Sequence, residues 1–499
     1  MKIITNEKIN FNSLEENTYK KMMELGRNII QEDLRMLDKL IKDCRDKEIF
    51  EVKDMRPTTL KTKLGEIPIT RRRYKMVIDG KVKWIYLLDE FLQINDFGLY
   101  SQSIVEMIAR EITKKSYRET AKTISEDTEN TISHTAVRNI VMKLGEKIKK
   151  LEEEKIKLYE EGKIEGNKDV KYVFCEHDGI YIKKQKAKHC KGKKKNKIKQ
   201  IKKNRSKKKK NGIEIKIAVI HEGKEPRYTN DFKLKNKTIV GTISQAKELK
   251  RIEDATIGTI YKEYKIKNII INGDGADWTG NIVEGAKEIF QLDMAHIQKK
   301  IYKAVENEEY LKQMQEIVYS EKPEDIFQLI YNYKVELETD KKIDELKKVQ
   351  ELEIYLKNNK EGILRYQYRL GYKEKQFKEI EQDLPSLGSE ESHMYSVCRD
   401  RMKKNRTSWS IKGAEAILKV IMSRMNTTLE EILNHKAEEK IKEELAQRIA
   451  EPIKVKKAKQ GKITYAGKYQ IANNFTGETK QYINDLLKDK KSSELMLIN

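Results

Sequence analysis

The sequence predicts an α/β core of the ribonuclease H-like class that carries a helical insertion. The first observation is the order of elements expected in residues 166–300: three strands, a helix, a strand, a helix and a short strand. The second is an apolar run over residues 268–273, rich in β-branched side chains, which predicts a buried strand ending at Asp274 between two glycines. In this order of elements, Asp178 on the first strand and Asp274 on the fourth strand are expected side by side.

The total charge indicates a polyanionic partner. Among 499 residues, 104 Lys and Arg outnumber 80 Asp and Glu, which gives a net charge of +24. Nucleic acid is the default partner of such a protein. No apolar stretch approaches the length of a membrane span, and the first residues lack the apolar core of a signal peptide. We therefore expect a cytoplasmic, nucleoid-associated protein that does not bind a membrane.

Two regions are expected before the DNA-binding candidate. Residues 1–57 carry apolar side chains at helical spacing, which predicts a helical region for packing or dimerisation. Residues 58–98 alternate between apolar and polar side chains, which predicts a small antiparallel meander of three strands, the last over residues 81–88. Three consecutive basic side chains in this meander either grip a phosphate backbone or protect a solvated edge strand from aggregation. They are Arg71, Arg72 and Arg73.

Residues 99–165 are predicted to form a helix-turn-helix region and a helical connector. The first helix is expected to begin at Tyr117, and Ser133 is expected to be the N-cap of the second helix, over residues 134–144. The apolar side chains of the second helix would face the core. Four side chains would remain on the face that could enter a major groove: His134, Thr135, Arg138 and Asn139. An ordinary helical hairpin fits the pattern equally well, and the positive net charge favours DNA binding.

The core elements are expected at definite places. The predicted strands cover residues 171–182, 212–221, 228–234 and 268–273. One helix is expected over 244–253, and a second, after Asp274, is expected to end at Ile289, before a short strand that starts at Phe290. A lysine block over residues 183–212 repels itself and cannot bury a core, so it is expected to form a loop between two strands. It would bind phosphates without reading sequence. Its candidate contacts are Lys193, Lys194, Lys195, Lys207 and Lys208.

Helical patterns rich in Glu and Lys interrupt the α/β alternation over residues 301–384, for example over 366–380. They indicate either an inserted helical subdomain or a long solvated stalk. Residues 385–434 are predicted to complete the core with an apolar helix, and residues 435–499 to form a charged C-terminal region.

Carboxylates at the ends of neighbouring elements are suited to binding two divalent cations. Mg²⁺ and Mn²⁺ prefer oxygen ligands, and two such ions about 4 Å apart activate the attacking oxygen and stabilise the leaving oxygen in phosphodiester displacement. Spacing alone does not select a third carboxylate from the many glutamates of this chain.

An ordered set of short motifs resembles the ISLre-type transposases of bacterial insertion sequences, which are DDE transposases related to the Mutator-like group. The motifs are Asp178-Gly179, Gly273-Asp274-Gly275-Ala276, Leu292-Asp293-Met294-Ala295-His296, Glu391-Ser392-His393 and Trp409-Ser410-Ile411-Lys412-Gly413-Ala414-Glu415. The resemblance extends over most of the chain. It implies that Asp178, Asp274 and Glu391 form a catalytic triad that binds two Mg²⁺ or Mn²⁺ ions, with the helical insertion before its third member. Glu390 is an alternative third ligand.

Several other side chains are candidates for contacts with DNA or with the metal ligands. His296 is suited to contact a phosphate or an extruded base, or is a histidine satisfied at the sheet edge. Trp278 and Trp409 are expected either to stack on bases near a cleaved end or to belong to the core. Lys299 and His393 are further candidates, and Asp293 is expected to be structural.

The resemblance implies an enzyme that cleaves DNA strands at the element ends and transfers the released 3′-hydroxyl to target DNA. Its partners would be double-stranded DNA at the ends and at the target. A homodimer or higher homo-oligomer is expected because two ends must be handled together. Two alternatives remain: a catalytically inactive DNA-binding regulator derived from a transposase, and a structure-specific ribonuclease H-like nuclease.

Overall fold

The chain divides into two compact units. The computed structural model describes residues 10–78, 80–92, 94, 97–185, 212–228, 231–276, 278, 285–388, 398–404 and 407–434. One unit comprises Met1–Leu60, Glu66–Leu99 and Lys436–Asn499, and the other comprises Lys61–Gly65 and Tyr100–His435. None of the helices within these described ranges combines the length and the apolar character needed to cross a membrane.

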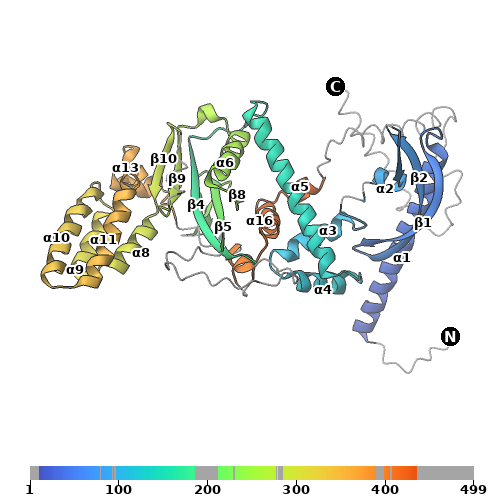
Figure 1. Ribbon diagram of the computed structural model, residues 1–499, viewed down its shortest axis with the longest axis horizontal. Coiled ribbons are helices and arrows are strands. Elements are labelled where there is room, and N and C mark those ends of the chain that lie inside the picture. The colour runs from blue at the N-terminus through green and yellow to red at the C-terminus, as the bar shows by residue number, and fades with distance from the viewer. Residues whose placement is uncertain are drawn as a thin grey trace, which may run out of the picture. The chain divides into compact units, whose positions relative to one another are not determined.

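The first unit packs a long helix against an antiparallel meander (Figure 1). Helix α1 (Phe11–Cys44) begins after Asn10, whose side chain accepts a hydrogen bond from the Ser13 amide. The meander has the order β1 (Glu51–Thr62), β2 (Gly65–Ile78) and β3 (Lys81–Ile85). A cluster of buried residues from α1, β2 and the short helix α2 (Leu87–Leu92), including Ile41, Tyr74 and Leu88, forms the core of this unit.

The meander differs from the prediction at both ends. Strand β1 begins at Glu51, within the region that was predicted to be helical, and β3 ends at Ile85. The residues that follow form α2 and do not extend the strand to residue 88. Leu87, Leu88 and Asp89 are all buried, a pattern that does not suit a strand with one solvated face. Strand β2 is the central strand, so the alternative of a charged edge strand for its arginines is wrong.

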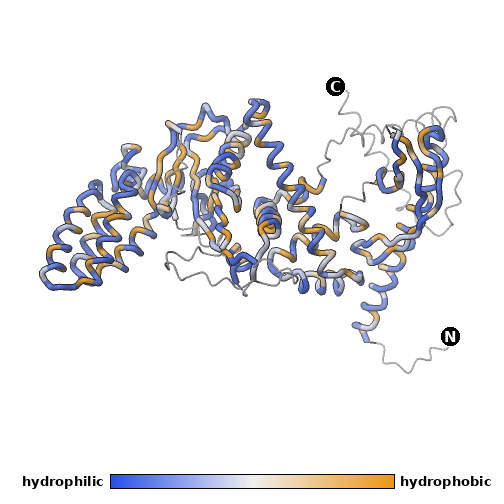
Figure 2. Tube along the Cα trace, viewed as in Figure 1, coloured by the Kyte–Doolittle hydropathy of each residue, from blue (hydrophilic) through white to orange (hydrophobic). Residues whose placement is uncertain are grey.

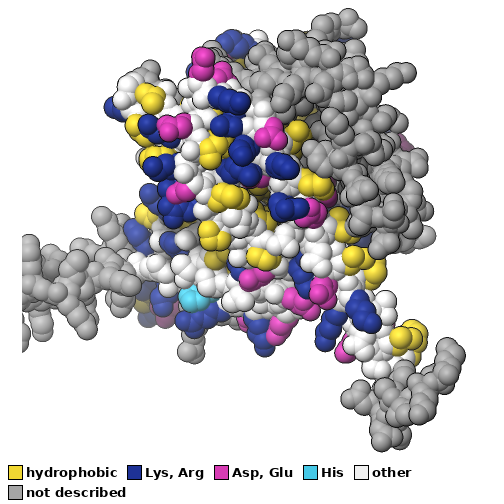
Figure 3. Space-filling model, turned by 90° about the vertical axis from the view of Figure 1, so that its right-hand side faces the viewer, with side chains coloured by type: hydrophobic (Ala, Val, Ile, Leu, Met, Phe, Trp, Pro, Cys, Tyr) yellow, Lys and Arg dark blue, Asp and Glu magenta, His cyan; other side chains and the backbone are white. Residues whose placement is uncertain are grey.

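The three consecutive arginines of β2 are paired with carboxylates of the same unit. Arg71 forms a buried ion pair with Asp89, and Arg72 forms one with Asp38. Arg73 donates two hydrogen bonds to Asp54, at 3.0 and 2.7 Å. Because each guanidinium group is already paired with a carboxylate, it is poorly placed to bind a phosphate backbone. We therefore assign the three arginines to the stabilisation of this unit. Other basic side chains of the unit, among them Lys53, Arg56, Lys81 and Lys83, are exposed, and Figure 3 shows many Lys and Arg side chains on its face.

In the second unit, three helices precede the sheet. They are α3 (Gln102–Ile112), α4 (Tyr117–Thr128) and α5 (His134–Glu160). The predicted N-cap of the last helix is confirmed, because Ser133 Oγ accepts a hydrogen bond from the Ala136 amide at 3.1 Å. Helix α5 is one continuous element, so the predicted recognition helix and the connector are parts of the same helix. Its middle crosses α16 (Ile411–Met425) closely, with Gly145 against Ala416.

The main sheet of the second unit has five strands. They are β4 (Tyr172–Lys183), β5 (Gly212–His221), β8 (Thr238–Thr242), β9 (Asn268–Gly273) and β10 (Glu288–Leu292). The order across the sheet is β10-β9-β4-β5-β8. Strand β5 is antiparallel to β4 and to β8, whereas β9 is parallel to both β4 and β10.

Both faces of the sheet are covered. Helix α6 (Ala246–Ile260) packs Leu249 and Ile252 against one face. On the other face, Tyr366 and Leu384 pack against Phe174. Hydrophobic residues are accordingly concentrated in the strands, whereas the helices beyond β10 alternate between hydrophobic and hydrophilic residues (Figure 2). A strand buried on both faces needs a nearly continuous apolar run, and the sequences of β4 and β9 supply it.

Three predicted elements of the core and of the insertion differ from the structure. The predicted strand over 228–234 is instead a separate hairpin of β6 (Lys224–Tyr228) and β7 (Asp231–Leu234), and the third strand of the sheet is β8. The helix expected up to Ile289 does not reach that residue, because Glu288 already pairs with Ile269 of β9. The helix expected over 366–380 in the insertion is broken into α13 (Tyr366–Arg369), a 3-10 helix (Glu374–Gln376) and α14 (Phe377–Ile380).

The helical insertion is a packed subdomain, which excludes the alternative of a solvated stalk. It contains α8 (Met294–Ala304), α9 (Glu308–Ile317), α10 (Ile326–Thr339) and α11 (Ile343–Asn358), followed by the short α12 (Lys360–Ile363). Its buried residues, including Ile301, Ile330 and Leu352, share one hydrophobic cluster with Leu292 at the end of β10. The helices therefore continue the core from the edge of the sheet (Figure 1).

The buried Arg71–Asp89 pair provides a test of the first unit. Replacing Asp89 by Asn leaves the Arg71 charge buried without its counter-ion, and we expect the free energy of unfolding to fall by about 3–5 kcal/mol. Urea denaturation followed by circular dichroism measures the change. The matched control is Glu51→Gln, because Glu51 pairs with Lys75 at 3.4 Å on the surface and should contribute about 1 kcal/mol or less. Equal destabilisation by the two substitutions would contradict the assignment.

Candidate functional site

Asp178 and Asp274 lie at the corresponding positions of two neighbouring parallel strands. The pairing between β4 and β9 runs from Tyr172 opposite Asn268 to Glu176 opposite Asn272. Two residues further along the chain are Asp178, within β4, and Asp274, directly after the end of β9, and the alternation of side chains places both on the same face of the sheet. Adjacent strands are about 4.8 Å apart. The structure thus brings together the two aspartates that the sequence had placed side by side.

The local backbone fixes both carboxylates. Asp178 Oδ1 accepts a hydrogen bond from the Gly179 amide at 2.6 Å, and Asp274 Oδ1 accepts one from the Ala276 amide at 2.9 Å. The carbonyl oxygen of Asp274 accepts a hydrogen bond from the hydroxyl of Tyr355 on α11, at 2.9 Å. The loop after β9 is therefore anchored to the helical subdomain, and the directions of the two side chains are set.

Gly275 allows the turn after β9 to pack closely against the helical subdomain. Its φ of +74° is in the left-handed region, and a Cβ atom at this position would lie 2.9 Å from atoms of Asn359, Leu292 and Tyr355. The glycine is needed because the helical subdomain packs closely against this turn. The space beside Gly275 is filled by protein and is not kept open for a metal or a phosphate.

The two aspartates interact electrostatically. The pKa of Asp178 is raised to about 6, mainly by burial and also by the negative charges of Asp274 and Asp293, while the hydrogen bond from the Gly179 amide and the nearby His296 act to lower it. Within the described ranges, neither Asp178 nor Asp274 forms an ion pair with a lysine or arginine. A bound cation would relieve this repulsion.

A second group of polar side chains lies next to the aspartate pair. Asp293 caps α8 by accepting a hydrogen bond from the His296 amide at 2.7 Å, and it also accepts bonds from His296 Nδ1 at 2.9 Å and from Asn272 Nδ2 at 3.2 Å. Burial alone would raise the pKa of Asp293, but these hydrogen bonds lower it. The hydrogen bond to Asp293 raises the pKa of His296. Asp293 thus holds the helix start, and it orients His296 beside the two aspartates.

Glu391, the third candidate ligand, lies outside the described residues, as do Glu390 and His393. The segment that leads to them starts beside the site. The Gly388 amide donates a hydrogen bond to Glu176 Oε2 at 3.0 Å. A Cβ atom on Gly388, which has a φ of +87°, would lie 2.2 Å from Asp293 Oδ2. Only glycine fits between these groups, so the chain is fastened three residues before Glu391.

The donor set fits Mg²⁺ or Mn²⁺. Two neighbouring carboxylates supply the oxygen ligands that these ions prefer, and the negative charge of Asp274 is one of the causes that raise the pKa of Asp178. The described residues contain no group of three His, Cys, Asp or Glu side chains that could hold a metal ion. A third carboxylate ligand beside Asp178 and Asp274 would therefore come from outside these residues, and water or phosphate oxygens could fill the other positions around the ion.

Trp278 and Trp409, the two candidates for stacking on bases, both pack with core residues. Trp409 is buried, and its Nε1 donates a hydrogen bond to the Met402 carbonyl at 2.8 Å. The Trp278 ring lies 6.0 Å from that of His177, on the face of β4 opposite to Asp178, where it packs with the residues under α6. Neither ring is placed to stack on a base at the aspartate pair. Lys299 is an exposed residue of α8.

The predicted recognition residues are exposed on the first turns of α5. His134, Thr135, Arg138 and Asn139 all face solvent, whereas Val137, Ile140 and Val141 are buried. The expected division of this helix into two faces is confirmed. The five lysines selected from the loop, Lys193, Lys194, Lys195, Lys207 and Lys208, lie outside the described residues.

Several polar residues around the site were not predicted. Glu176 Oε1 lies 3.2 Å from His221 Nε2, and the His221 ring stacks on Phe174. On the opposite face, His177 Nε2 contacts Glu253 Oε2 at 2.5 Å. Three consecutive polar residues within an apolar strand, Glu176-His177-Asp178, were a signal that both faces of β4 carry polar side chains with buried partners. The partners could not be identified, because each lies on a different strand or helix.

The raised pKa of Asp178 has a measurable consequence for stability. Because its folded pKa of about 6 lies above the ordinary value of 3.8, this group favours the folded state at low pH, and its contribution is lost as the pH rises through 6. Without divalent metal, Asp178→Asn should therefore stabilise the protein at pH 8 by about 1–2 kcal/mol and have little effect near pH 4. Urea denaturation in EDTA at both values tests this. The exposed Asp340→Asn is the control, and an equal effect of Asp178→Asn at both pH values would contradict the prediction.

Comparison with known proteins identifies relatives of similar length. A UPF0236 protein of Caldanaerobacter subterraneus subsp. tengcongensis, whose name joins eleven designations, is 26% identical over 414 residues, which cover 82% of this chain and 77% of the relative. A second UPF0236 protein of the same organism, whose name joins four designations, is 25% identical over 417 residues, covering 82% of this chain and 77% of the relative. The match to a family model over residues 4–440 shows that the chain belongs to the Uncharacterised protein family (UPF0236).

Proposed function

We propose that the chain is a DDE transposase of a bacterial insertion sequence, of the ISLre type, that cleaves DNA at the element ends and joins the released strand to target DNA. The observation that carries the proposal is the parallel pairing of β4 and β9, which brings Asp178 and Asp274 to the same face of the sheet. Two carboxylates in this arrangement suit metal-dependent phosphodiester chemistry.

The topology supports a ribonuclease H-like core. Read from the edge, the strands β8, β5 and β4 form an antiparallel meander, and β9 and β10 then continue parallel to β4. The sequence pattern predicted three strands, a helix and a further strand in this order along the chain, but it assigned the third strand to residues 228–234 and not to β8. The helical subdomain follows β10, which agrees with an insertion placed before the third acidic residue.

Glu391 is the proposed third ligand, with Glu390 as the alternative. Gly388 is anchored between Glu176 and Asp293, and three residues of extended chain span at most about 10 Å. This anchor supports the proposal because it starts the Glu391 segment beside the aspartate pair. His393 and Lys299 would be available for phosphate contacts.

Each group has a role in the proposed reaction. When bound, two Mg²⁺ or Mn²⁺ ions would activate the attacking oxygen and stabilise the leaving oxygen. Asp178, Asp274 and Glu391 would hold the ions, and they must be ionised to do so. His296, which is oriented by Asp293, would place a positive charge beside the phosphate. Tyr355 keeps the Asp274 loop in position through its hydrogen bond to the backbone.

DNA binding is supported by surface charge and by α5. The chain carries a net charge of +24, and the exposed side chains at the start of α5, including Arg138 and Asn139, form a face that suits a major groove. The lysine-rich loop and the exposed lysines of the meander would add contacts to phosphates that do not depend on sequence. Exposed apolar side chains of α1, such as Phe11 and Met22, which are 74% and 61% exposed, support self-association.

The names of the relatives also favour a mobile element. One relative's name joins eleven designations and another's joins four, all in one organism. We read each designation as one gene locus. Many copies of one gene in a single genome are the trace that a transposing element leaves, and neither a regulator nor a repair nuclease requires them. A cytoplasmic, nucleoid-associated location follows from this function.

Replacing Asp274 tests the function directly. The purified chain, incubated with labelled element ends, Mg²⁺ and a target plasmid, should nick the ends and join them to the plasmid. Asp274→Asn should reduce both products at least 100-fold, because one metal ligand loses its charge, while binding to the ends is retained. The control, Asp340→Asn, should behave as the unmodified chain does.

The same assay separates the alternatives. Cleavage without joined products would favour a structure-specific nuclease. Binding of the ends without cleavage in either Mg²⁺ or Mn²⁺ would favour a DNA-binding regulator. Equal activity of Asp274→Asn and the unmodified chain would refute a metal-dependent role for this residue.

The recognition face of α5 has its own test. The double substitution Arg138→Gln and Asn139→Ala should weaken binding to element ends at least 10-fold, because it removes contacts to base edges. Binding to unrelated DNA should fall much less, since that binding depends on total charge. Fluorescence anisotropy measures both. Lys122→Gln on α4, where the side chain is 76% exposed, is the control, and a similar loss for both DNA sequences would argue against sequence reading by α5.

A further inference from the structure

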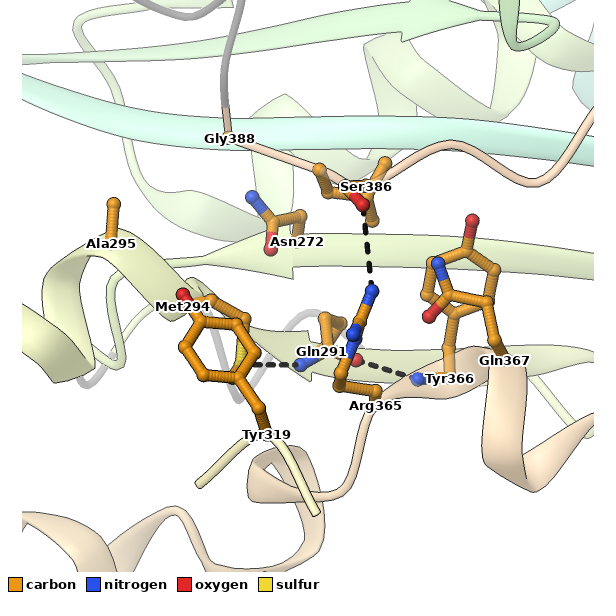
Figure 4. A pocket seen from close by; sticks show the side chains of 11 residues that line it. Asn272, Gln291, Met294, Ala295, Tyr319, Arg365, Tyr366, Gln367, Ser386 and Gly388 are labelled. Carbon is orange, nitrogen blue, oxygen red and sulfur yellow. Dashed lines mark hydrogen bonds between the residues drawn. The ribbon is translucent and has the colours of Figure 1, made fainter. Parts of the chain in front are cut away.

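A pocket lies beside the aspartate pair, where the edge of the sheet meets the segment that returns from the helical subdomain. Its volume is about 340 Å³. Figure 4 shows Arg365 between Gln291 and Ser386, with the Tyr319 ring forming one side and Asn272 on the strand behind. Asn272 lies on β9 and precedes Asp274 by two residues, a separation of about 7 Å in extended chain. The pocket is therefore within one nucleotide of the proposed reaction centre.

Asn272 presents an unpartnered hydrogen-bond acceptor to this pocket. The residue is 2% exposed, and its Nδ2 donates to Asp293 Oδ2 at 3.2 Å. Because an ionised carboxylate only accepts hydrogen bonds, this contact fixes the orientation of the amide. Asn272 Oδ1 then has no hydrogen-bond donor within the described residues. A buried acceptor of this kind is suited to a ligand that offers an N–H group.

Arg365 supplies a positive charge without a carboxylate partner among the described residues. Its guanidinium group donates a weak hydrogen bond to Ser386 Oγ at 3.4 Å and lies 4.5 Å from the Phe377 ring. The group is thus held by neutral neighbours. A guanidinium in this state is suited to a phosphate, which it can contact with two parallel hydrogen bonds.

Tyr319 supplies an aromatic surface. Its ring centre lies 5.8 Å from the Arg365 guanidinium carbon, the residue is 40% exposed, and its carbonyl oxygen accepts a hydrogen bond from the Tyr368 hydroxyl at 3.2 Å. The backbone of Tyr319 is therefore held by this hydrogen bond, while part of the residue remains exposed. By contrast, Gln291 is saturated, since it donates to the carbonyls of Leu292 and Gly362 and accepts from the Tyr366 amide.

We propose that this pocket binds one nucleotide that has left the base stack. The base would stack on Tyr319 and donate an N–H group to Asn272 Oδ1, and its phosphate would contact Arg365. A volume of about 340 Å³ is at the lower end of the range for small-molecule sites, so it accepts one nucleotide but not a duplex. That the nucleotide belongs to a DNA strand rests on the proposed function; a free nucleotide offers the same chemistry.

The test compares DNA duplexes that differ by one nucleotide. The full chain is titrated in EDTA, which prevents cleavage, with a labelled blunt duplex and with the same duplex carrying one unpaired adenine at a 3′ end. We expect the unpaired nucleotide to tighten binding at least five-fold. An abasic nucleotide at that position should not, because it lacks the base that stacks on Tyr319. Free 2′-deoxyadenosine 5′-monophosphate is added as a competitor in a parallel titration.

Substitutions then assign the effect to the pocket. Tyr319→Ala and Arg365→Gln should each reduce the preference for the unpaired adenine to less than two-fold. Arg251→Gln is the matched control, because it removes the same charge from α6 on the opposite face of the sheet, where Arg251 pairs with Glu160. A 2-aminopurine in place of the adenine reports the same event, since stacking on Tyr319 changes its fluorescence.

The outcomes separate this inference from the proposed function. A chain that cleaves and joins ends but binds both duplexes equally overturns the inference and leaves the transposase proposal intact. A different result would be a chain that neither binds nor cleaves duplex DNA but binds the free nucleotide, with lower affinity in Tyr319→Ala and Arg365→Gln. That result supports nucleotide binding by the pocket and overturns the transposase proposal. Equal effects of Arg365→Gln and Arg251→Gln also overturn the inference.

Discussion

The parallel pairing of β4 with β9 is the interaction on which the candidate site depends. Because the register places Glu176 opposite Asn272, Asp178 and Asp274 follow at the same level and on the same face. A shift of one residue would turn one carboxylate to the face covered by α6. The register itself is held by apolar contacts on both faces, through Phe174 and Ile270 on one side and Cys175 and Ile271 on the other.

The structure has to stabilise this arrangement, because two neighbouring carboxylates repel each other in a partly buried site. Polar groups around them are tied to backbone or to one another: Asp293 joins Asn272 to His296, and Glu176 joins His221 to the Gly388 amide. These contacts fix the frame but do not neutralise Asp178 and Asp274. The frame is therefore rigid, and the charge that remains at its centre is suited to a divalent cation.

The sequence predicted the elements whose pattern is local. The apolar run before Asp274, the strand that carries Asp178 and the two faces of α5 are all properties of short segments, and each was found at or near its expected place. Partners distant in sequence were not predictable. Arg71, Arg72 and Arg73 looked like a phosphate contact until the structure paired them with Asp89, Asp38 and Asp54. Strand β8 was missed because five residues around a glycine give a weak signal, and only its pairing with β5 defines it.

The helical subdomain does more than separate Asp274 from the proposed third ligand. It begins at the end of β10 and returns through Tyr366, which packs against the face of the sheet that carries Asp178. On the way, Tyr355 holds the Asp274 loop from one side, and Tyr319 and Arg365 line the pocket beside Asn272. Because the Asp274 loop and one wall of the pocket belong to the same packed body, a substrate that fills the pocket would press on the element that orients Asp274. Occupancy of the pocket and the geometry of the aspartate pair are therefore expected to be coupled, since each depends on how the subdomain packs against the end of β9.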